Sequence, residues 1–461
     1  MNKIIEDISG QKHILLNEID RGGQGAVYRT QTPNIAVKLV FDDKGLYKCV
    51  DSAGTSLQSL MTLPIPRNIN ITLPYSMLKQ YEGYVMPLMD DMESFGVFDI
   101  ALEKLQTSCS NKWLKRYEED NPEWVSVMRQ YIDSGGRRRR LDAYFKVACI
   151  LSSLHANGLI YCDFSANNAF ISNKGNGIVW LIDVDNINFR SRANIVFTPS
   201  FAAPEVINGG RCSFYSDSYS FAVSLFWHLT GTHPFKGGLL DNVSEDDFVD
   251  QHEEKAYSGK WPWIFDKEDD SNSIETLIHK DNVLSKELER FFDMTFSETG
   301  KNNKHCRPSM FLWSYILAKE LDCSVKCSFC GMDYNKSFSI CPWCNFINSK
   351  ISLKSKTQNG ILWEVCHELT EEEFKIPYRI IHGFRTKEYD KYAFSISLNN
   401  EILSIGNFDD KYKWNILLDG KPVFYDCSAS SKIPLEQVKN SKCTIICNDK
   451  TNQHEITLEI N

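Results

Sequence analysis

The 461-residue chain lacks several features that would place it in other protein classes. No apolar run reaches the roughly 18 residues that a membrane span needs, and the first residues lack the apolar core of a secretion signal. Basic residues are outnumbered, with 51 Lys and Arg against 60 Asp and Glu and a net charge of −9. This balance argues against nucleic-acid binding as the main role. We therefore expect a soluble, cytoplasmic protein.

Cysteine is plentiful, but its pattern argues against a disulfide framework because the count of 15 is odd and no secretion signal is present. Two Cys-x-x-Cys pairs, Cys327 with Cys330 and Cys341 with Cys344, are separated by ten residues. Four thiolates at this spacing can surround one Zn²⁺ ion, and Gly331 suits the tight turn after the first pair. The pattern predicts a structural zinc ribbon, with a redox dithiol as the alternative.

The distribution of apolar patterns predicts several units of an α+β chain. Strand-like patterns dominate before residue 90 and helical patterns after residue 140. We predict a bilobal domain over 1–320, with an N-lobe at about 1–90 and a C-lobe at about 91–320. A zinc ribbon at 321–347, a linker at 348–360 and a β-rich, sandwich-like interaction domain at 361–461 would follow, since the last part contains alternating apolar runs and hairpin turns.

Three local predictions concern the bilobal domain. Helices are expected at about 53–63 and 113–131. The run Gly135–Arg140 is expected to be a basic loop, because four consecutive arginines interrupt the apolar pattern. A solvated loop is one reading of this run, and a site for a phosphorylated or acidic partner is the other.

A small set of polar residues suggests phosphate chemistry. Asp163 and Asn168 are five residues apart in one loop, and Asp183 closes an apolar run that follows. Lys38 ends an apolar strand, where a bound anion would explain its charge, and a snorkelling lysine at the sheet edge is the alternative. Gly22, Gly23 and Gly25 would let the backbone approach phosphates. Such groups suit a Mg²⁺–phosphate site with one carboxylate left as a base.

Six motifs occur in the order found in the eukaryotic-like, Hanks-type protein kinase family. The chain resembles a divergent, bacterial-type member of this family that carries a C-terminal four-cysteine zinc ribbon. The resemblance covers about 15–320. The motifs are the Gly-rich loop Asp20–Val27, the lysine strand Ile35–Lys38, the hinge Met86–Met89, the catalytic loop Tyr161–Asn168, the metal motif Asp183–Asp185 and the end of the activation segment Thr198–Glu205. The family pattern also places a helix-capping carboxylate at Asp217 and pairs Arg307 with Glu205.

The resemblance implies roles for these residues. Lys38 would hold the phosphates of ATP, Asn168 and Asp183 would bind Mg²⁺ or Mn²⁺, and Asp163 would accept the proton of a substrate Ser or Thr hydroxyl. It also implies a protein substrate and, as further partners, a cognate phosphatase or another signalling protein. The nucleotide would further contact Gly22, Gly23, Gly25, Val27, Ala36, Met86, Leu88 and Met89.

The chain departs from the family pattern around these residues. Residues 39–81 contain no glutamate, so the helix partner that the family provides for Lys38 is missing. Asp185 replaces a glycine and adds a carboxylate that could help to bind a second ion. Ser165 replaces a lysine that contacts the γ-phosphate. Cys162 replaces the arginine that receives an activation-loop phosphate, which argues against activation by phosphorylation of that loop.

These departures leave three functions to compare. The first is an ATP- and Mg²⁺-dependent protein serine/threonine kinase of low or conditional activity, whose zinc ribbon and β-rich domain select partners. The second is a nucleotide-binding pseudokinase that acts as a scaffold in signalling. The third is a nucleotidyl transferase on the same fold. Retention of Lys38, Asp163, Asn168 and Asp183 favours the first.

Overall fold

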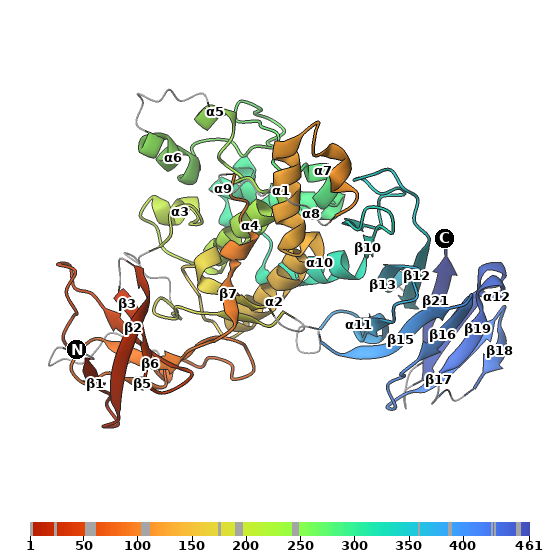
Figure 1. Cartoon of the computed structure of the whole chain (residues 1–461), viewed down its shortest axis with the longest axis horizontal. Coiled ribbons are helices and arrows are strands. Elements are labelled where there is room, and N and C mark those ends of the chain that lie inside the picture. The colour runs from red at the N-terminus through yellow and green to blue at the C-terminus, as the bar shows by residue number, and fades with distance from the viewer. Residues whose placement is uncertain are drawn as a thin grey trace.

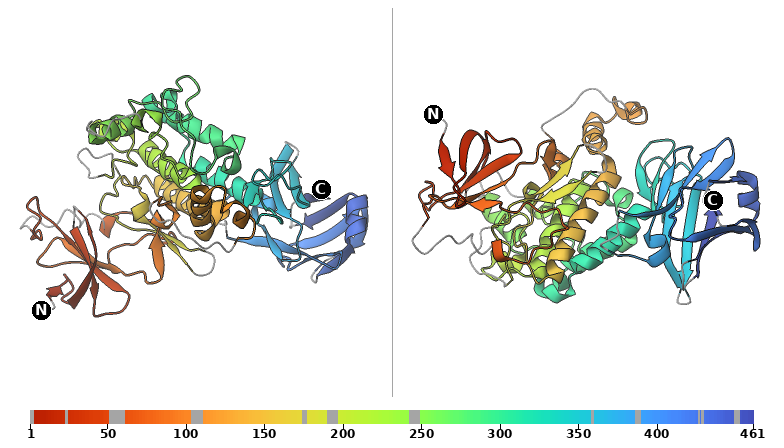
Figure 2. Two further views of the ribbon diagram at one scale, coloured as in Figure 1. Left: turned by 45° about the horizontal axis from the view of Figure 1, so that its top comes forward. Right: turned by 90° about the horizontal axis from the view of Figure 1, so that it is seen from below.

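The computed structural model describes most of the chain. A small N-terminal β-sheet, a central helical region and a C-terminal pair of sheets follow one another along the long axis of the molecule (Figure 1). The C-terminal sheets lie on the far side of the helical region from the N-terminal sheet (Figure 2). The described residues are 3–22, 25–50, 61–102, 111–173, 177–189, 197–241, 249–357, 360–385, 390–425, 427, 430–448 and 453–461.

The N-terminal region is a six-stranded antiparallel sheet with the order β1-β2-β3-β4-β6-β5. Alternate side chains of its strands form a small core of their own that includes Leu15, Val37 and Val85. The strands are β1 (Ile4–Glu6), β2 (Lys12–Gly22), β3 (Gly25–Thr30), β4 (Ile35–Val40), β5 (Ser76–Met77) and β6 (Gly83–Pro87).

The central region is built around the buried helix α4 (Phe214–Thr230). Ser213 and Ser216 cap its start reciprocally, and Gly231 ends it with φ +73°. The longest helix, α2 (Gly136–Ala156), contacts α4 and α10 (Met310–Asp322). The remaining helices are α1 (Pro122–Asp133), α3 (Pro204–Ile207), α5 (Gly238–Asp241), α6 (Val249–Tyr257), α7 (Lys280–Val283), α8 (Lys286–Phe296) and α9 (Glu298–Asn302).

A three-stranded sheet, β7-β8-β9, belongs to the C-lobe, and the predicted catalytic loop leads into its strand β8. It consists of β7 (Met92–Ser94), β8 (Ala169–Ser172) and β9 (Val179–Leu181). The loop that contains Asp163 joins α2 to β8, and the loop that contains Asp183 follows β9. Ala169 at the start of β8 pairs with Leu181 at the end of β9. The loop before β8 and the loop after β9 therefore meet at the same end of this sheet.

The C-terminal third contains a short hairpin and two antiparallel sheets. The hairpin joins β10 (Ser324–Lys326) to β11 (Asp333–Asn335). The larger sheet has the order β13-β12-β21-β20-β17-β18 and the smaller one β14-β15-β16-β19. Their inner faces share a core, in which Phe394 of the smaller sheet lies 5.3 Å from Trp414 of the larger. The α+β class and the β-rich C-terminus predicted from sequence are confirmed.

The bounds of the elements in this part are β12 (Lys350–Thr357), β13 (Gly360–Glu368), β14 (Phe374–Pro377), α11 (Arg379–His382), β15 (Tyr392–Asn399), β16 (Ile402–Gly406), β17 (Lys413–Leu418), β18 (Lys421–Phe424), β19 (Ser431–Pro434), α12 (Leu435–Asn440), β20 (Cys443–Asn448) and β21 (Gln453–Ile460).

The predicted linker at 348–360 is wrong. Strand β12 occupies most of it and pairs with both β13 and β21. Ile351 and Leu353 alternate with polar residues and are fully buried, so the strand contributes to the core. The ribbon and the sheets are therefore joined by packed structure.

The predicted basic loop at Gly135–Arg140 is also wrong. Helix α2 begins at Gly136, and the side chains of Arg137 and Arg140 are buried. Arg137 donates to Val283 O (2.8 Å) and pairs with Glu320, while Arg140 donates to His228 O (2.7 Å) and Phe98 O (3.0 Å). Carbonyl groups from distant segments satisfy these cations, which leaves neither of them for an external anion.

Two further helix predictions had different outcomes. The helix at 113–131 is shorter, because Pro122 starts α1 and a 3₁₀ turn precedes it at Leu114–Tyr117. The helix at 53–63 falls mainly outside the described residues. Within the described part of the chain, no helix has both the length and the apolar character for crossing a bilayer.

Candidate active site

The catalytic loop places Asp163 under the activation segment. Thr198 donates both its backbone N–H (3.0 Å) and its hydroxyl (3.2 Å) to Asp163 Oδ1. Burial raises the pKa of Asp163; the bond from the Thr198 backbone opposes this effect, and the Asp183 charge adds to it. A carboxylate with a raised pKa is a stronger base, which suits proton abstraction from a hydroxyl group.

Asp217 holds the strained backbone before Asp163. Cys162 has φ +77°, which is uncommon for a residue with a side chain. The Asp217 carboxylate accepts the backbone N–H groups of Tyr161 and Cys162, each at 2.8 Å, and also contacts His155 Nε2 at 2.9 Å. The buried Asp217 carboxylate thus holds this backbone conformation, and the conformation sets the direction in which the Asp163 side chain points.

Asn168 and Asp183 lie next to each other at the ends of β8 and β9. Asn168 Nδ2 donates to Asp163 O at 2.8 Å. This bond uses the nitrogen of the side-chain amide and leaves its oxygen for another contact. The backbone N–H of Ile182 donates to Asn168 O at 2.9 Å, and Asp183 has φ +56°. An amide oxygen and a carboxylate are donor types that suit Mg²⁺, and this backbone bond keeps the two residues that supply them adjacent.

Lys38 reaches this group of residues from the other lobe. Its Nζ lies 2.7 Å from Asp183 Oδ1 and 2.6 Å from Asp185 Oδ2, and its side chain is only 9% exposed. Burial alone would lower the pKa of Lys38, but the charges of Asp185 and Asp183 outweigh it and raise this pKa. The missing helix glutamate therefore does not leave Lys38 unpaired. Two carboxylates from the metal motif hold the lysine instead.

The predicted nucleotide-contacting backbone is formed by β3, β4 and β6. Gly22 and Gly25 pair across the turn, Val27 pairs with Lys38, and Ala36 pairs with Met86. A Cβ atom at Gly25 would lie 2.2 Å from Leu39 O, so the close approach of the strands requires this glycine. Gly23 lies outside the described residues. Leu88, whose N–H donates to Asn34 O at 2.8 Å, and Met89 continue the chain after β6.

The activation segment ends in an ion pair with the helical region. Arg307 makes a bidentate contact with Glu205, at 2.8 and 2.9 Å, and its side chain is fully buried. The pairing implied by the resemblance is therefore present. His233 supports the same segment from below by contacting Ser200 O through Nε2 at 2.8 Å.

The four predicted zinc ligands form one cluster. All four Sγ atoms lie within 4.8 Å of one another, and the pairs Cys327–Cys344 and Cys330–Cys341 are 3.6 and 3.7 Å apart. Tetrahedral Zn²⁺ with bonds near 2.3 Å requires sulfur atoms about 3.8 Å apart. Gly331 has φ +76°, in keeping with the turn expected there. The cluster therefore has the size and donor atoms that a zinc ion needs.

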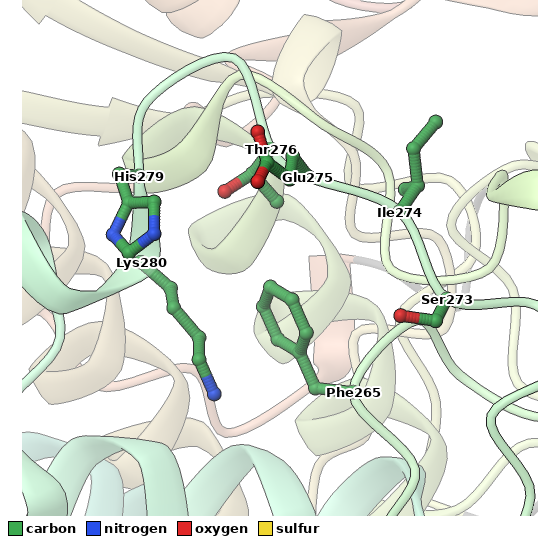
Figure 3. Close-up of a pocket in the computed structure, with 7 residues that line it drawn as sticks. All are labelled: Phe265, Ser273, Ile274, Glu275, Thr276, His279 and Lys280. Carbon is green, nitrogen blue, oxygen red and sulfur yellow. The ribbon is translucent and has the colours of Figure 1, made fainter.

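A separate cavity of about 400 Å³ is lined by seven residues between Phe265 and Lys280 (Figure 3). Its lysine is already engaged, because Lys280 Nζ lies 2.9 Å from Glu289 and 4.4 Å above the Phe265 ring. Thr276 similarly donates its hydroxyl to Ile278 O at 2.8 Å. These polar groups stabilise the fold around the cavity, and none belongs to the predicted active site.

The arrangement around Asp163 has a counterpart among known proteins. Residues 136–306 match the family model of the protein kinase domain. This part of the chain is therefore similar to protein kinase domains of the Hanks type. The match begins with α2 and includes Asp163, Asn168, Asp183 and Thr198, while Lys38 lies before it.

Several curated kinases are similar to part of the chain. Human "Protein kinase C delta type" is 33% identical over 128 residues, which are 26% of this chain and 19% of that protein. "Serine/threonine-protein kinase pkn2" of Myxococcus xanthus is 32% identical over 128 residues, 26% and 15% of the two chains. "Serine/threonine-protein kinase YPK3" of Saccharomyces cerevisiae is 22% identical over 172 residues, 34% and 31%. The chain thus spans less than a third of the length of each of these relatives.

Sequence reasoning missed two features of the kinase site. Thr198 was quoted only as part of a motif, although it is the residue that contacts Asp163. Asp185 was interpreted as a further metal ligand, although it lies against Lys38. A threonine placed 35 residues after Asp163 gives no local signal of contact. The absence of glutamate at 39–81 was the signal that Lys38 needed another partner.

Proposed function

We propose that this protein kinase domain is an ATP- and Mg²⁺-dependent protein serine/threonine kinase. The observation that carries the proposal is the contact of Asp163 Oδ1 with the Thr198 hydroxyl at 3.2 Å. The carboxylate is already placed to accept a hydrogen bond from an aliphatic hydroxyl group, and a substrate Ser or Thr offers the same group. The kinases that match this chain and are named as serine/threonine kinases support the same choice.

The roles of the residues follow from their chemistry. Asp163 would accept the proton of the substrate hydroxyl, and its raised pKa strengthens it as a base. Asn168 and Asp183 would hold Mg²⁺, and Lys38 would orient the phosphates of the nucleotide. MgATP supplies the phosphoryl group and the cation that neutralises charge during the transfer. Gly22, Gly25 and the segment Met86–Met89 would contact the nucleotide with their backbone.

The test is incubation of the full chain with Mg²⁺ and either γ-labelled or α-labelled ATP, together with a mixed Ser/Thr peptide substrate. We expect label from the γ position only, on phosphoserine or phosphothreonine, and no label with Asp163→Ala. Transfer of the α label would identify a nucleotidyl transferase. Absence of label, with ATP still raising the melting temperature, would identify a nucleotide-binding scaffold and overturn the proposal.

We also propose that Cys327, Cys330, Cys341 and Cys344 bind one structural Zn²⁺ ion. Sulfur separations of 3.6 and 3.7 Å match a tetrahedral site, and four thiolates leave no position for a substrate. Elemental analysis of protein purified under reducing conditions should give about one zinc per chain. Cys341→Ser should lose this zinc. The control Cys323→Ser, which removes a buried thiol outside the cluster, should retain it.

The zinc ribbon and the C-terminal sheets are further proposed to recognise partners of the kinase, including protein substrates. Exposed apolar side chains of the ribbon support this role: Phe329 and Phe346 are stacked at 5.5 Å, and Ile347 is exposed nearby in the sequence. A pull-down with the full chain and with Phe329→Asp should differ in the proteins retained. Identical sets of proteins would argue against recognition by this surface.

A further inference from the structure

The carboxylate of Asp185 occupies a position that the proposed metal role does not explain. Its Oδ2 lies 2.6 Å from Lys38 Nζ, and its side chain is only 10% exposed. Burial raises the pKa of Asp185, whereas the charge of Lys38 opposes that effect. Separating a buried carboxylate from a buried ammonium costs free energy, because each charge would remain buried without its partner.

The two carboxylates around Lys38 have different surroundings. Asp183 follows β9 next to Asn168, so it has a second oxygen donor as a neighbour. Asp185 is directed toward the N-lobe, where its Oδ2 lies 2.6 Å from Lys38 Nζ and where Tyr84 pairs with Lys38 across β4 and β6. Asp183 therefore adjoins Asn168, while Asp185 contacts the lysine through Oδ2 and its Oδ1 is buried without a hydrogen-bond partner among the residues that the structure describes.

The net charge around Lys38 favours the same assignment, in which Asp183 faces a cation and Asp185 stays with the lysine. One ammonium between two carboxylates leaves a net charge of −1 in a buried position. If Asp183 turned to a bound cation, Lys38 would keep one carboxylate and could offer its remaining N–H groups to phosphate. If both carboxylates turned to cations, the buried lysine would have only the phosphates to orient it.

We propose that Asp185 is the positioning residue of Lys38, in place of the helix glutamate that residues 39–81 lack. This inference rests on the proposed nucleotide-binding function. Asp185 holds the lysine while Asp183 is released to the cation. Since Asp185 comes from the activation-segment side of the site, alignment of the lysine depends on the contact between the lobes. It does not require a glutamate from an N-lobe helix.

The first test measures nucleotide affinity with and without Mg²⁺ in the full chain. Asp183→Asn should abolish most of the improvement in affinity that Mg²⁺ brings. Asp185→Asn should keep that improvement within about twofold, yet weaken MgATP binding about threefold to tenfold, which is in the lower range of couplings between contacting residues. In a Lys38→Met background, Asp185→Asn should cause no further weakening. Asp293→Asn, at an exposed pair with Lys267, is the matched control and should change nothing.

Two results would overturn the proposal. If Asp185→Asn reduces the Mg²⁺ effect as much as Asp183→Asn does, Asp185 is a metal ligand. If Asp185→Asn weakens binding equally with and without Lys38, it does not act through the lysine.

A second measurement separates this inference from the proposed function, because it uses no nucleotide. The melting temperatures of the chain, Lys38→Met, Asp185→Asn and the double variant form a thermodynamic cycle. Without Lys38 the carboxylates of Asp183 and Asp185, which lie 2.7 and 2.6 Å from its Nζ, repel each other. Asp185→Asn should therefore change the melting temperature by at least about 2 °C more favourably in the Lys38→Met background than in the unchanged chain.

Additive changes would contradict the pairing even if the chain binds ATP. A cycle with coupling in a chain that binds no nucleotide would retain the pairing and refute the function.

Discussion

The C-lobe and the N-lobe use charge differently. In the C-lobe, Arg137 with Glu320 and Arg307 with Glu205 place arginines in the interior, where they link distant segments. In the N-lobe, the arginine pair Arg29–Asp90 is about half exposed, and the buried carboxylate of Asp7 faces a histidine, His13, instead of an arginine. Lys38 is the cation through which the N-lobe reaches the site, and its partners belong to the other lobe. The C-lobe is thus held together by ion pairs of its own, while the N-lobe is joined to the site by a cross-lobe ion pair.

The largest effect is expected for Asp163, the proposed base, which lies in the C-lobe. Asp163→Asn keeps the shape of the side chain and can still accept from Thr198, but it cannot take a proton. Phosphoryl transfer should fall by about 10²- to 10⁴-fold, while nucleotide affinity changes less than about threefold. Rates with labelled γ-ATP and a binding titration measure the two effects. A rate that stays within threefold of the unchanged chain would show that Asp163 is not the base.

The buried arginines of the C-lobe provide the next test. Arg137→Met should lower the free energy of unfolding by about 3–5 kcal/mol, because it leaves Glu320 buried without its cation. Chemical denaturation measures this loss. Lys319→Met, on the same helix as Glu320, removes the more exposed pair with Glu287 and should cost less than about 1 kcal/mol. Equal losses would remove the distinction between buried and exposed pairs.

The pH dependence of stability should reveal a buried histidine of the C-lobe. Burial lowers the pKa of His233 from 6.5 to about 3. Its Nδ1 accepts the Phe235 N–H at 3.2 Å, so a proton there would face another donor. The unfolded chain binds a proton below pH 6.5 and the folded chain does not, so His233 stabilises the fold above pH 6.5. This contribution is lost as the pH falls toward 3, by at most about 1.4 kcal/mol per pH unit. His233→Gln should reduce that slope in denaturation series between pH 4 and 7. An unchanged slope would contradict this assignment.

The smallest effect is expected at the surface of the N-lobe. Arg29→Ala should lower the free energy of unfolding by less than about 1 kcal/mol, since the pair with Asp90 is exposed and solvent screens it. The same denaturation assay applies. A loss comparable to that of Arg137→Met would mean that the N-lobe depends on surface charge as much as the C-lobe depends on its interior.

The sequence predicted best those features that short motifs encode. The four cysteines, the Asp163 and Asn168 loop and the alternating strands after residue 361 all depend on local spacing, and the structure places each in the expected type of element. Strand β12 had such a signal too, in the alternation of Ile351 and Leu353, but its lysines and serines resembled a linker. Local composition misled because the polar residues are the outward half of a strand.

The features that could not be predicted depend on contacts across long sequence distances. Arg137 and Arg140 are buried because carbonyl groups at Val283 and His228 meet them, and no local pattern announces this. The partner of Lys38 lies 147 residues away, at Asp185. In each case the missing information was which distant group compensates a buried charge.

The packed junction after the kinase domain has a consequence for any partner that the C-terminal sheets bind. Asp322 at the end of α10 pairs with Arg379 and accepts from Trp363 Nε1 at 2.7 Å, and β12 begins directly after the ribbon. A partner on a flexible tether would explore a volume, and its local concentration at the kinase site would fall smoothly with tether length. A partner on this rigid arm has one position relative to Asp163. Its phosphorylatable hydroxyl is therefore either within reach at high effective concentration or out of reach altogether, so geometry alone can act as a filter on substrates.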